Sequence, residues 1–281
     1  MDDLSFSFGC KRILDGFSFS AERGQVMSVL GPNGVGKTTM LRCMCGILKP
    51  ERGTVTIDGR NVTELTRKEM AKNVASVPQS VPRTHTTVYD SVLLGRKPYV
   101  ELGVTAEDLE ITSRAIGGIG LRDLALEYTD RISGGEFQKV QIARAIAQEP
   151  KVMVLDEPTN NLDLANQHRT MGMVAEMASR LGICAVMTMH DINLSAYYSD
   201  LLVFMKDGRA VACGGKDIIT PKLVKEVYDM DVDVILHGST PVIVPCRGRS
   251  GEAARAHLRS HSHPHDAADH IFLHTTGERP T

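Results

Sequence analysis

A phosphate-binding loop constrains this chain more than any other feature. Residues 31–38 read Gly-Pro-Asn-Gly-Val-Gly-Lys-Thr and match every fixed position of the pattern G-x-x-x-x-G-K-[ST]. The apolar residues 26–30 precede the loop and predict a buried parallel strand, and residues 38–45 can form the helix that follows. Backbone N–H groups of such a loop, at the start of a helix, bind phosphate oxygens. The sequence therefore predicts a nucleoside triphosphate site in an α/β fold.

Two side chains of the loop have specific expected roles. Lys37 can reach the β- and γ-phosphates, and the Thr38 hydroxyl can coordinate Mg²⁺. A glycine-rich turn without a ligand is the alternative, but strand, loop and helix all fall where phosphate binding needs them. The candidate nucleotide contacts of the loop are Gly31, Pro32, Asn33, Gly34, Val35, Gly36, Lys37, Thr38 and Thr39.

Two adjacent carboxylates follow a second apolar run. Residues 152–155 lead into Asp156 and Glu157, and ligand sites in open α/β sheets lie at the carboxyl ends of strands. We expect Asp156 to hold Mg²⁺ and Glu157 to polarise a water molecule for attack on the γ-phosphate. A kinase would need an acceptor site instead, so a glutamate here favours hydrolysis. The alternative is an acidic strand end that opens a loop at Pro158.

Ser133-Gly-Gly-Glu136 reads as a capping box that begins a helix over residues 137–148. Two glycines in the first turn are unfavourable for a helix. They are explained if the backbone must approach another group closely, and a helix N-terminus with free N–H groups binds anions. An ordinary capped helix is the alternative.

In this order and combination, the motifs resemble the nucleotide-binding subunit of ABC transporters over roughly residues 4–245. The resemblance implies an α/β P-loop NTPase fold, the ABC cassette. It consists of a RecA-like core, an N-terminal antiparallel β lobe and a helical insert over about residues 86–150. It also implies that the nucleotide is ATP, bound with Mg²⁺, and that the chain is an ATPase.

The resemblance assigns further residues of this sequence to the site. Phe8 lies where the family places an aromatic ring on adenine, although the family usually has Tyr there; a core aromatic is the alternative. Gln79 is expected near Mg²⁺ and the attacking water, and His190 at the γ-phosphate. Ile132 replaces the usual Leu at the start of the signature. The signature residues Ser133, Gly134, Gly135 and Glu136, together with Asp163 of the following loop, are expected to contact ATP.

The resemblance also implies partners. The family's signature completes the site of a facing subunit, and this chain has one phosphate loop and one signature. A second copy, arranged head-to-tail, would therefore complete two sites. Residues 79–99 would contact transmembrane permease subunits, and a periplasmic or extracellular binding protein would take part indirectly. The chain would thus lie at the cytoplasmic face of the membrane as a peripheral protein.

Charge and hydropathy agree with these expectations. The formal net charge of −2 argues against a nucleic-acid partner, which would usually meet a basic field. No apolar run approaches the roughly 18 residues that a membrane-spanning helix needs. The six cysteines are scattered, and we expect most of them to be reduced core residues.

Two segments bear on the transported solute. Residues 93–99, Leu-Leu-Gly-Arg-Lys-Pro-Tyr, and the closing residues 227–245 resemble the branch that powers uptake of iron–siderophore complexes, haem and cobalamin. The segment 93–99 could instead be only a helix end and a loop. An ATPase for a different solute, and a soluble ABC ATPase without a permease, remain alternatives.

The C-terminal tail, residues 246–281, is rich in histidine. Six of the ten histidines lie there, and neutral imidazoles bind transition metals. The same polar, Gly- and Pro-containing composition predicts disorder without any metal site. The six are His257, His261, His263, His265, His270 and His274.

Overall fold

The computed structural model describes residues 1–246, and residues Met1–Pro245 form one compact unit. The metal-binding hypothesis for the histidine-rich tail falls on residues 247–281 and so lies outside the described residues. No helix within residues 1–246 is long and apolar enough to cross a membrane.

A six-stranded sheet forms the centre of the molecule, with the strand order β11-β10-β3-β9-β8-β7. All neighbouring strands are parallel except β11, which pairs antiparallel with β10 at one edge. The strands are β3 (Val26–Leu30), β7 (Val74–Val77), β8 (Val152–Asp156), β9 (Cys184–Met189), β10 (Leu201–Lys206) and β11 (Arg209–Gly214). The predicted strand at 26–30 and the apolar run at 152–155 are confirmed as β3 and β8, to within one residue at each end.

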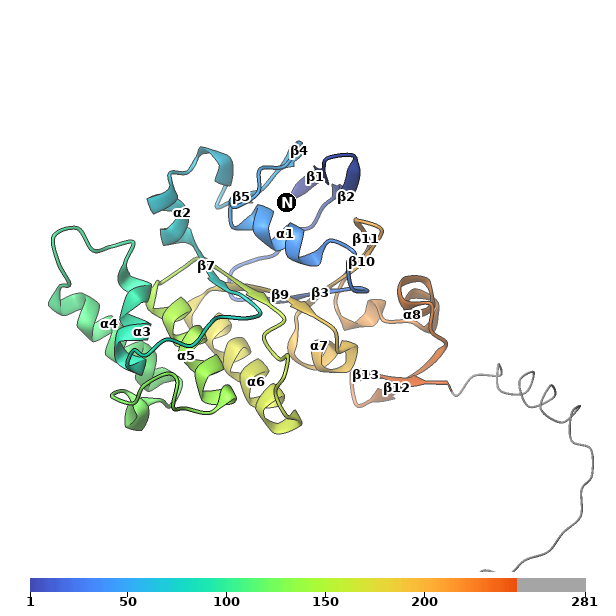
Figure 1. The fold of residues 1–281 in the computed structure, drawn as a ribbon. Helices are drawn as coiled ribbons and strands as arrows, with labels where there is room; N and C mark the ends of the chain where they lie inside the picture. The colour runs from blue at the N-terminus through green and yellow to red at the C-terminus, as the bar shows by residue number, and fades with distance from the viewer. Residues whose placement is uncertain (247–281) are drawn as a thin grey trace, which may run out of the picture. The chain divides into compact units, whose positions relative to one another are not determined.

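Alternation along β3 divides the core into two layers, because successive side chains of a strand point to opposite faces. Val26 and Leu30 pack in one cluster with the helices α5 (Gly134–Ala147) and α6 (Leu164–Leu181). Met27 and Val29 pack in the other cluster with α1 (Lys37–Met44) and the N-terminal strands. Figure 1 shows α1 on one side of the sheet and α5, α6 and α7 (Ile192–Tyr198) on the other.

An antiparallel lobe lies over α1. It has the strand order β2-β1-β4, and a short ribbon follows it. These strands are β1 (Asp2–Phe8), β2 (Lys11–Phe17), β4 (Arg52–Thr54), β5 (Thr56–Ile57) and β6 (Arg60–Asn61). Residues 52–57 form two short strands, with Val55 between them. The Val55 side chain is buried, and the pairing partner changes at this residue: β4 pairs with β1, whereas β5 pairs with β6.

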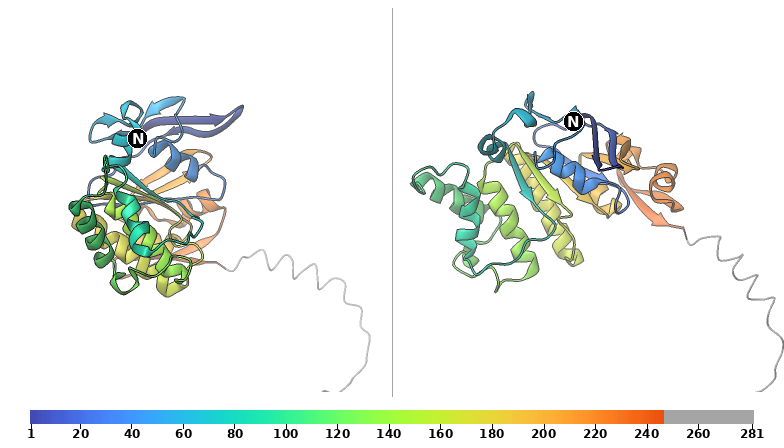
Figure 2. Two further views of the ribbon diagram at one scale, coloured as in Figure 1. Left: turned by 60° about the vertical axis from the view of Figure 1, so that its left-hand side comes forward. Right: turned by 45° about the horizontal axis from the view of Figure 1, so that its top comes forward.

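Three helices lie between β7 and β8 in the sequence. After α2 (Arg67–Asn73) and β7 come α3 (Val88–Leu93), α4 (Ala106–Gly118) and α5. The right-hand view of Figure 2 shows α3 and α4 beyond the β7 edge of the sheet, away from β10 and β11. The chain then closes with α8 (Pro221–Tyr228) and the hairpin β12 (Val232–His237) and β13 (Thr240–Pro245).

Residues 93–99 are only partly exposed, and Arg96 is one of the buried residues. Its side chain is almost fully buried. It donates hydrogen bonds to Asp108 Oδ1 at 2.9 Å, to the Ala147 carbonyl at 2.9 Å and to Glu149 Oε2 at 2.8 Å. The Arg96 guanidinium therefore links the start of α4 to the end of α5. Of this segment, Leu94 is the large apolar side chain left exposed.

The expectation that most of the six cysteines lie in the core holds for only some of them. Cys43 and Cys184 are buried, and burial raises the pKa of both thiols to about 11. Cys10 and Cys213, by contrast, are exposed. The scattered positions of the cysteines in the sequence did not show which of them lie at strand ends or turns and which lie in the core.

Candidate functional site

The phosphate loop connects β3 to α1, and its glycines are required by the surrounding backbone. A Cβ atom on Gly31 would lie 2.3 Å from the Met205 carbonyl oxygen. Gly36 has a φ of +112° and its Cβ would lie 2.9 Å from the Ile13 carbonyl oxygen. Gly36 is also the N-cap of α1 and offers no side chain to the first N–H groups of the helix. Those N–H groups therefore stay available to an anion.

Lys37 is held tightly against this loop. Its side chain is buried, and Nζ donates to the Gly31 carbonyl at 2.7 Å and the Pro32 carbonyl at 3.0 Å. Burial lowers the pKa of the ammonium, and the nearby carboxylates of Glu157 and Asp156 oppose that shift. The cation is thus fixed at the loop, opposite the two acidic groups.

The structure brings together Asp156 and Thr38, the two residues expected to hold Mg²⁺. Thr38 Oγ1 donates to Asp156 Oδ1 at 3.3 Å, and Thr188 Oγ1 donates to the same oxygen at 2.7 Å. Thr188 is the penultimate residue of the neighbouring strand β9. Two adjacent parallel strands and the phosphate loop therefore converge on one carboxylate.

Glu157 lies at the centre of a hydrogen-bonded group. Gln79 Nε2 donates to its Oε2 at 2.7 Å, Asn160 Nδ2 donates to the same oxygen, and a hydrogen bond joins His190 Nε2 to Oε1. Its backbone has a φ of +51°, and its N–H donates to Thr188 Oγ1 at 3.0 Å. The structure thus places two predicted catalytic side chains, Gln79 and His190, in direct contact with the third, Glu157.

Asn160 was missed by the sequence reasoning. Its backbone N–H donates to the Glu157 carbonyl at 3.1 Å, which forms a turn, and its side chain then reaches back to the carboxylate. An asparagine three residues after an acidic group, in a segment that follows a strand, is the signal that could have identified it.

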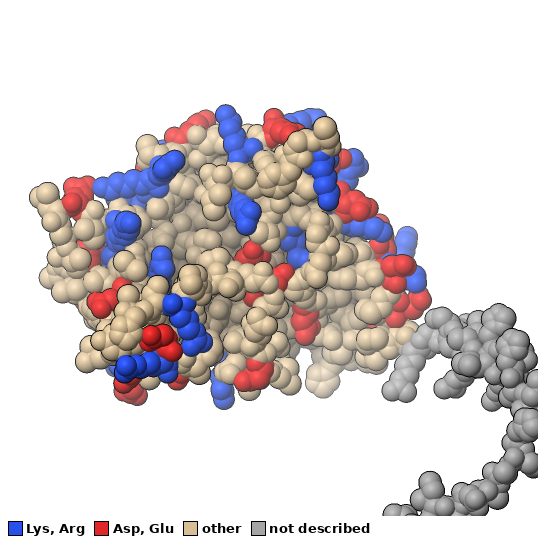
Figure 3. All heavy atoms as spheres, in the orientation of Figure 1, with Lys and Arg blue, Asp and Glu red and all other residues tan. Residues whose placement is uncertain are grey.

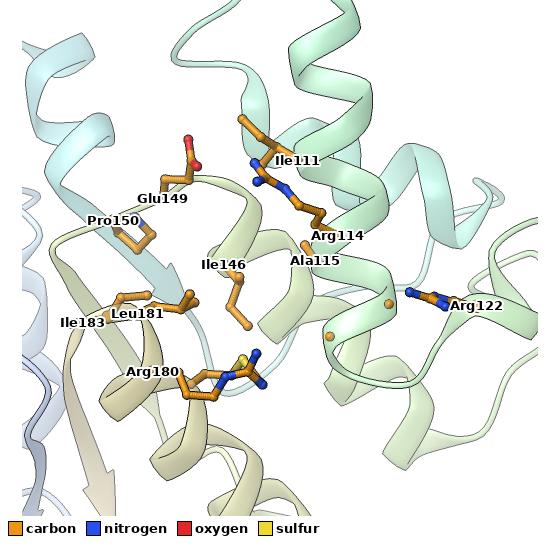
Figure 4. A pocket seen from close by; sticks show the side chains of 13 residues that line it. Ile111, Arg114, Ala115, Arg122, Ile146, Glu149, Pro150, Arg180, Leu181 and Ile183 are labelled. Carbon is orange, nitrogen blue, oxygen red and sulfur yellow. The ribbon is translucent and has the colours of Figure 1, made fainter.

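A hollow of about 190 Å³ lies at this group, lined by the loop, Ile13 of β2 and Glu157. A larger hollow of about 600 Å³ lies elsewhere, between α4 and the ends of α5 and α6; Figure 4 shows Arg114 and Arg180 on its two sides and Ile146 between them. On the face drawn in Figure 3, basic and acidic side chains are interspersed without a continuous basic field.

Comparison with known proteins identifies the family. The family model described as ABC transporter matches residues 14–160. An uncharacterized ABC transporter ATP-binding protein of Methanocaldococcus jannaschii is 44% identical over 87% of this chain and 96% of its own. This chain is an ABC transporter ATP-binding protein. It is therefore an ATP-binding cassette and an ATPase.

Two further similarities extend the comparison. A hemin import ATP-binding protein of Thermobifida fusca is 33% identical and covered over 87% of each chain. The structure of cbiO1 from Clostridium perfringens, part of the cbiONQ transporter complex, superposes with a TM-score of 0.72. It is 30% identical over 80% of this chain and 91% of its own. Cassettes of this kind work with permease subunits.

Phe8 of the cassette is exposed and not a core aromatic. Its side chain keeps 52% of its surface accessible, and its ring meets the buried Phe6 edge-on at 4.9 Å. Phe8 lies at the end of β1, in the hairpin whose second strand carries Ile13. The hairpin thus connects the exposed ring to the wall of the phosphate hollow.

The signature of the cassette forms the predicted capping box. Glu136 N donates to Ser133 Oγ at 3.3 Å, and Ser133 N donates to Glu136 Oε2 at 2.8 Å. Hydrogen bonds from the Ser133 side chain, and then from its backbone N–H, lower the pKa of the Glu136 carboxyl. A Cβ atom on Gly135 would lie 3.2 Å from Asn166, whose amide bonds to Asp163 at 2.8 Å. Among the described residues, no hydrogen bond links this group to the phosphate loop, Asp156 or Glu157.

One chain therefore assembles part of the predicted site. The loop, Asp156, Glu157, Gln79 and His190 come together. Ser133–Glu136 and Asp163 form a second group at the adjoining starts of α5 and α6.

Proposed function

We propose that this cassette is the ATP-hydrolysing subunit of an ABC importer for a metal chelate of the iron–siderophore, haem or cobalamin class. It would act at the cytoplasmic face of the membrane with a permease and, indirectly, an external binding protein. The contact of Glu157 with Gln79 and His190, beside the Thr38–Asp156 pair, supports the ATP-hydrolysing role.

The residues present fit a magnesium ion that arrives with ATP. Thr38 and Asp156 offer a hydroxyl and a carboxylate oxygen, the hard donors that Mg²⁺ prefers. No group of three or more His, Cys, Asp or Glu side chains in residues 1–246 is arranged to hold a metal ion by itself, so the phosphates would supply further ligands. When bound, the ion would neutralise charge on the β- and γ-phosphates. Gln79 would approach it through its amide oxygen.

Glu157 is the group that would polarise the attacking water. Its carboxylate accepts hydrogen bonds from the amides of Gln79 and Asn160, so its orientation is fixed before any substrate binds. A positioned carboxylate contributes to proton transfer only within hydrogen-bond reach of the water. The α1 N-terminus and Lys37 would hold the phosphates, and His190 would contact the γ-phosphate.

Two chains would complete two sites. The signature of one chain is remote from its own phosphate loop in the hydrogen-bond network, yet it offers the N-terminal N–H groups of α5 to an anion. In a head-to-tail dimer, Ser133–Glu136 and Asp163 would face the ATP of the partner. Phe8 would stack on adenine at the other end of the nucleotide.

The chelate assignment rests on similarity. The hemin import relative is similar over most of both chains. Leu94, exposed next to buried Arg96, offers an apolar contact within residues 79–99, where a permease would dock.

The test is recovery of the complex from the native host. A tagged Glu157→Gln chain would be extracted from membranes in mild detergent with MgATP, and its partners identified by mass spectrometry. We expect a polytopic permease at about one per cassette. Deletion of the cassette should then abolish uptake of one labelled chelate, and the wild-type chain should restore it. Recovery of the tagged chain only from the soluble fraction, without a membrane partner, would overturn the importer proposal.

A further inference from the structure

Arg83 contacts both flanks of the signature motif. Its NH1 donates to the Ile132 carbonyl at 2.6 Å, directly before the N-cap Ser133. Its guanidinium also lies over the ring of Phe137, 5.1 Å from the centroid. A Cβ atom on Gly134 would lie 3.8 Å from the same guanidinium. The Arg83 side chain thus lies next to the motif at three points.

A ladder of hydrogen bonds fixes the backbone on which Arg83 stands. Residues 84–89 pair with residues 125–130, and we name these two segments the 84–130 ladder. Thr129 N donates to the Thr86 carbonyl at 2.9 Å, and Val88 N donates to the Glu127 carbonyl at 2.9 Å. Thr129 Oγ1 donates to the Thr84 carbonyl at 2.6 Å.

Side chains reinforce the 84–130 ladder at the end next to Arg83. The rings of His85 and Tyr128 stack 4.0 Å apart, nearly parallel. His85 Nδ1 also lies 2.9 Å from Asp130 Oδ2. The hydrogen bond from Arg83 to Ile132 therefore continues this connected structure and is not an isolated surface contact.

The other end of this connection is the catalytic group. Gln79, four residues before Arg83, donates to Glu157 Oε2. Only residues 80–82 separate the glutamine at this chain's own ATP site from the arginine at its signature. The loss of Arg83 would leave the Ile132 carbonyl without its charged donor and release the capping residue that follows.

We propose that Arg83 is a positioning residue for the signature motif, and that it acts on the ATP held by the facing subunit. The inference rests on the proposed head-to-tail dimer. Arg83 fixes the position and direction of the α5 N-terminus, so that the N–H groups of the first helical turn meet the γ-phosphate across the interface. It does not touch the ATP in its own phosphate loop.

The first test separates binding from turnover in the full-length chain. Arg83→Ala should lower kcat about tenfold, the effect of losing one charge-assisted hydrogen bond. Binding of a fluorescent ATP analogue to the dilute monomer should be unchanged. Arg83→Lys, which keeps a cationic donor for Ile132, should retain most of the activity. Arg131→Ala is the matched control, because Arg131 stacks on Tyr128 of the ladder without bonding to the motif.

The second test assigns the effect to a subunit. An excess of the hydrolysis-deficient Glu157→Gln chain, with its intact signature, is added to Arg83→Ala. This addition should raise ATP hydrolysis towards the wild-type rate. In the mixed dimer, the phosphate loop of the Arg83→Ala chain faces the intact signature motif of the Glu157→Gln chain. The double variant Glu157→Gln/Arg83→Ala should not rescue.

Three results would overturn the proposal: unchanged kcat in Arg83→Ala, equal activity with both added partners, or weaker analogue binding by the monomer. Failure of the dimer itself would be visible separately, because Glu157→Gln alone would then stay monomeric with MgATP. A melting temperature for each variant, measured by circular dichroism, distinguishes misfolding from loss of position.

Discussion

At the scale of single residues, the site depends on a strained glutamate. Glu157 adopts a left-handed backbone conformation that costs a non-glycine residue about 1–3 kcal/mol. The Thr188 hydroxyl accepts its N–H, and Gln79, Asn160 and His190 hold its carboxylate. Because the side chain is only 13% exposed, these partners replace much of its solvent. The strained residue thus lines the phosphate hollow with its carboxylate held by several partners.

The ring of Phe8 gives a prediction at this scale. Phe8→Ala should raise the Kd for ATP about tenfold, because an aromatic–base stack contributes about 1–3 kcal/mol. Folding should be unaffected, since the side chain is exposed. Phe8→Tyr keeps the ring and is the matched control, with an expected Kd close to wild type. Isothermal titration of ATP measures both, and equal affinity in all three chains would remove Phe8 from the site.

At the scale of elements, the helical region is attached to the core by a buried charge network. Arg96 joins η2 (Leu94–Arg96) to Asp108 at the start of α4 and to the carbonyl of Ala147 at the end of α5. Its guanidinium also lies 4.0 Å from the centroid of the Tyr99 ring. Removing one partner from a buried network leaves the others desolvated and unpaired.

Arg96→Ala should therefore lower the free energy of unfolding by about 3 kcal/mol. The exposed pair Arg180–Glu176, at 2.9 Å, provides a matched control. Arg180→Ala should change stability by less than about 0.5 kcal/mol, as is typical of surface pairs. Urea unfolding followed by circular dichroism measures both, and equal losses in the two variants would contradict the buried network.

The same network predicts a pH dependence. The backbone N–H of Thr105, then the Arg96 guanidinium and the Thr105 hydroxyl, lower the pKa of Asp108 from its ordinary value of 3.8. A carboxyl with a lowered folded pKa adds stability above its unfolded pKa, and that stability is lost as pH falls through the folded pKa. Asp108→Asn should thus destabilise the chain at pH 7, with a difference that shrinks below pH 3.8. A constant difference across this range would exclude the carboxylate as its source.

Elements of this fold differ in how far the sequence predicts them. The strands around the phosphate loop, Asp156 and His190 were predictable because apolar runs end at motifs with known chemistry. The capping box at Ser133 was also predictable, since its signal is local. The break at Val55, the burial of Arg96 and the contact of Arg83 with Ile132 were not, because each depends on a partner distant in the sequence.

At the scale of the whole molecule, the chain separates its chemistry into two groups. The phosphate loop, Asp156 and Glu157 lie at the carboxyl ends of β3 and β8, whereas the signature lies at the start of α5. The two groups are connected within one chain through Gln79, Arg83 and the 84–130 ladder. Two chains facing head-to-tail would join each phosphate loop to a signature, so we predict that ATP itself holds the dimer together.

The most direct test of this central claim is sedimentation velocity of the full-length Glu157→Gln chain with and without MgATP. We predict a monomer without nucleotide and a dimer at saturating MgATP, with ATP hydrolysis on the order of 10²–10⁴-fold slower than wild type. Lys37→Ala, which removes the cation at the phosphate loop, should stay monomeric in both conditions. A Glu157→Gln chain that remains monomeric at saturating MgATP, or that hydrolyses ATP at the wild-type rate, would contradict the account.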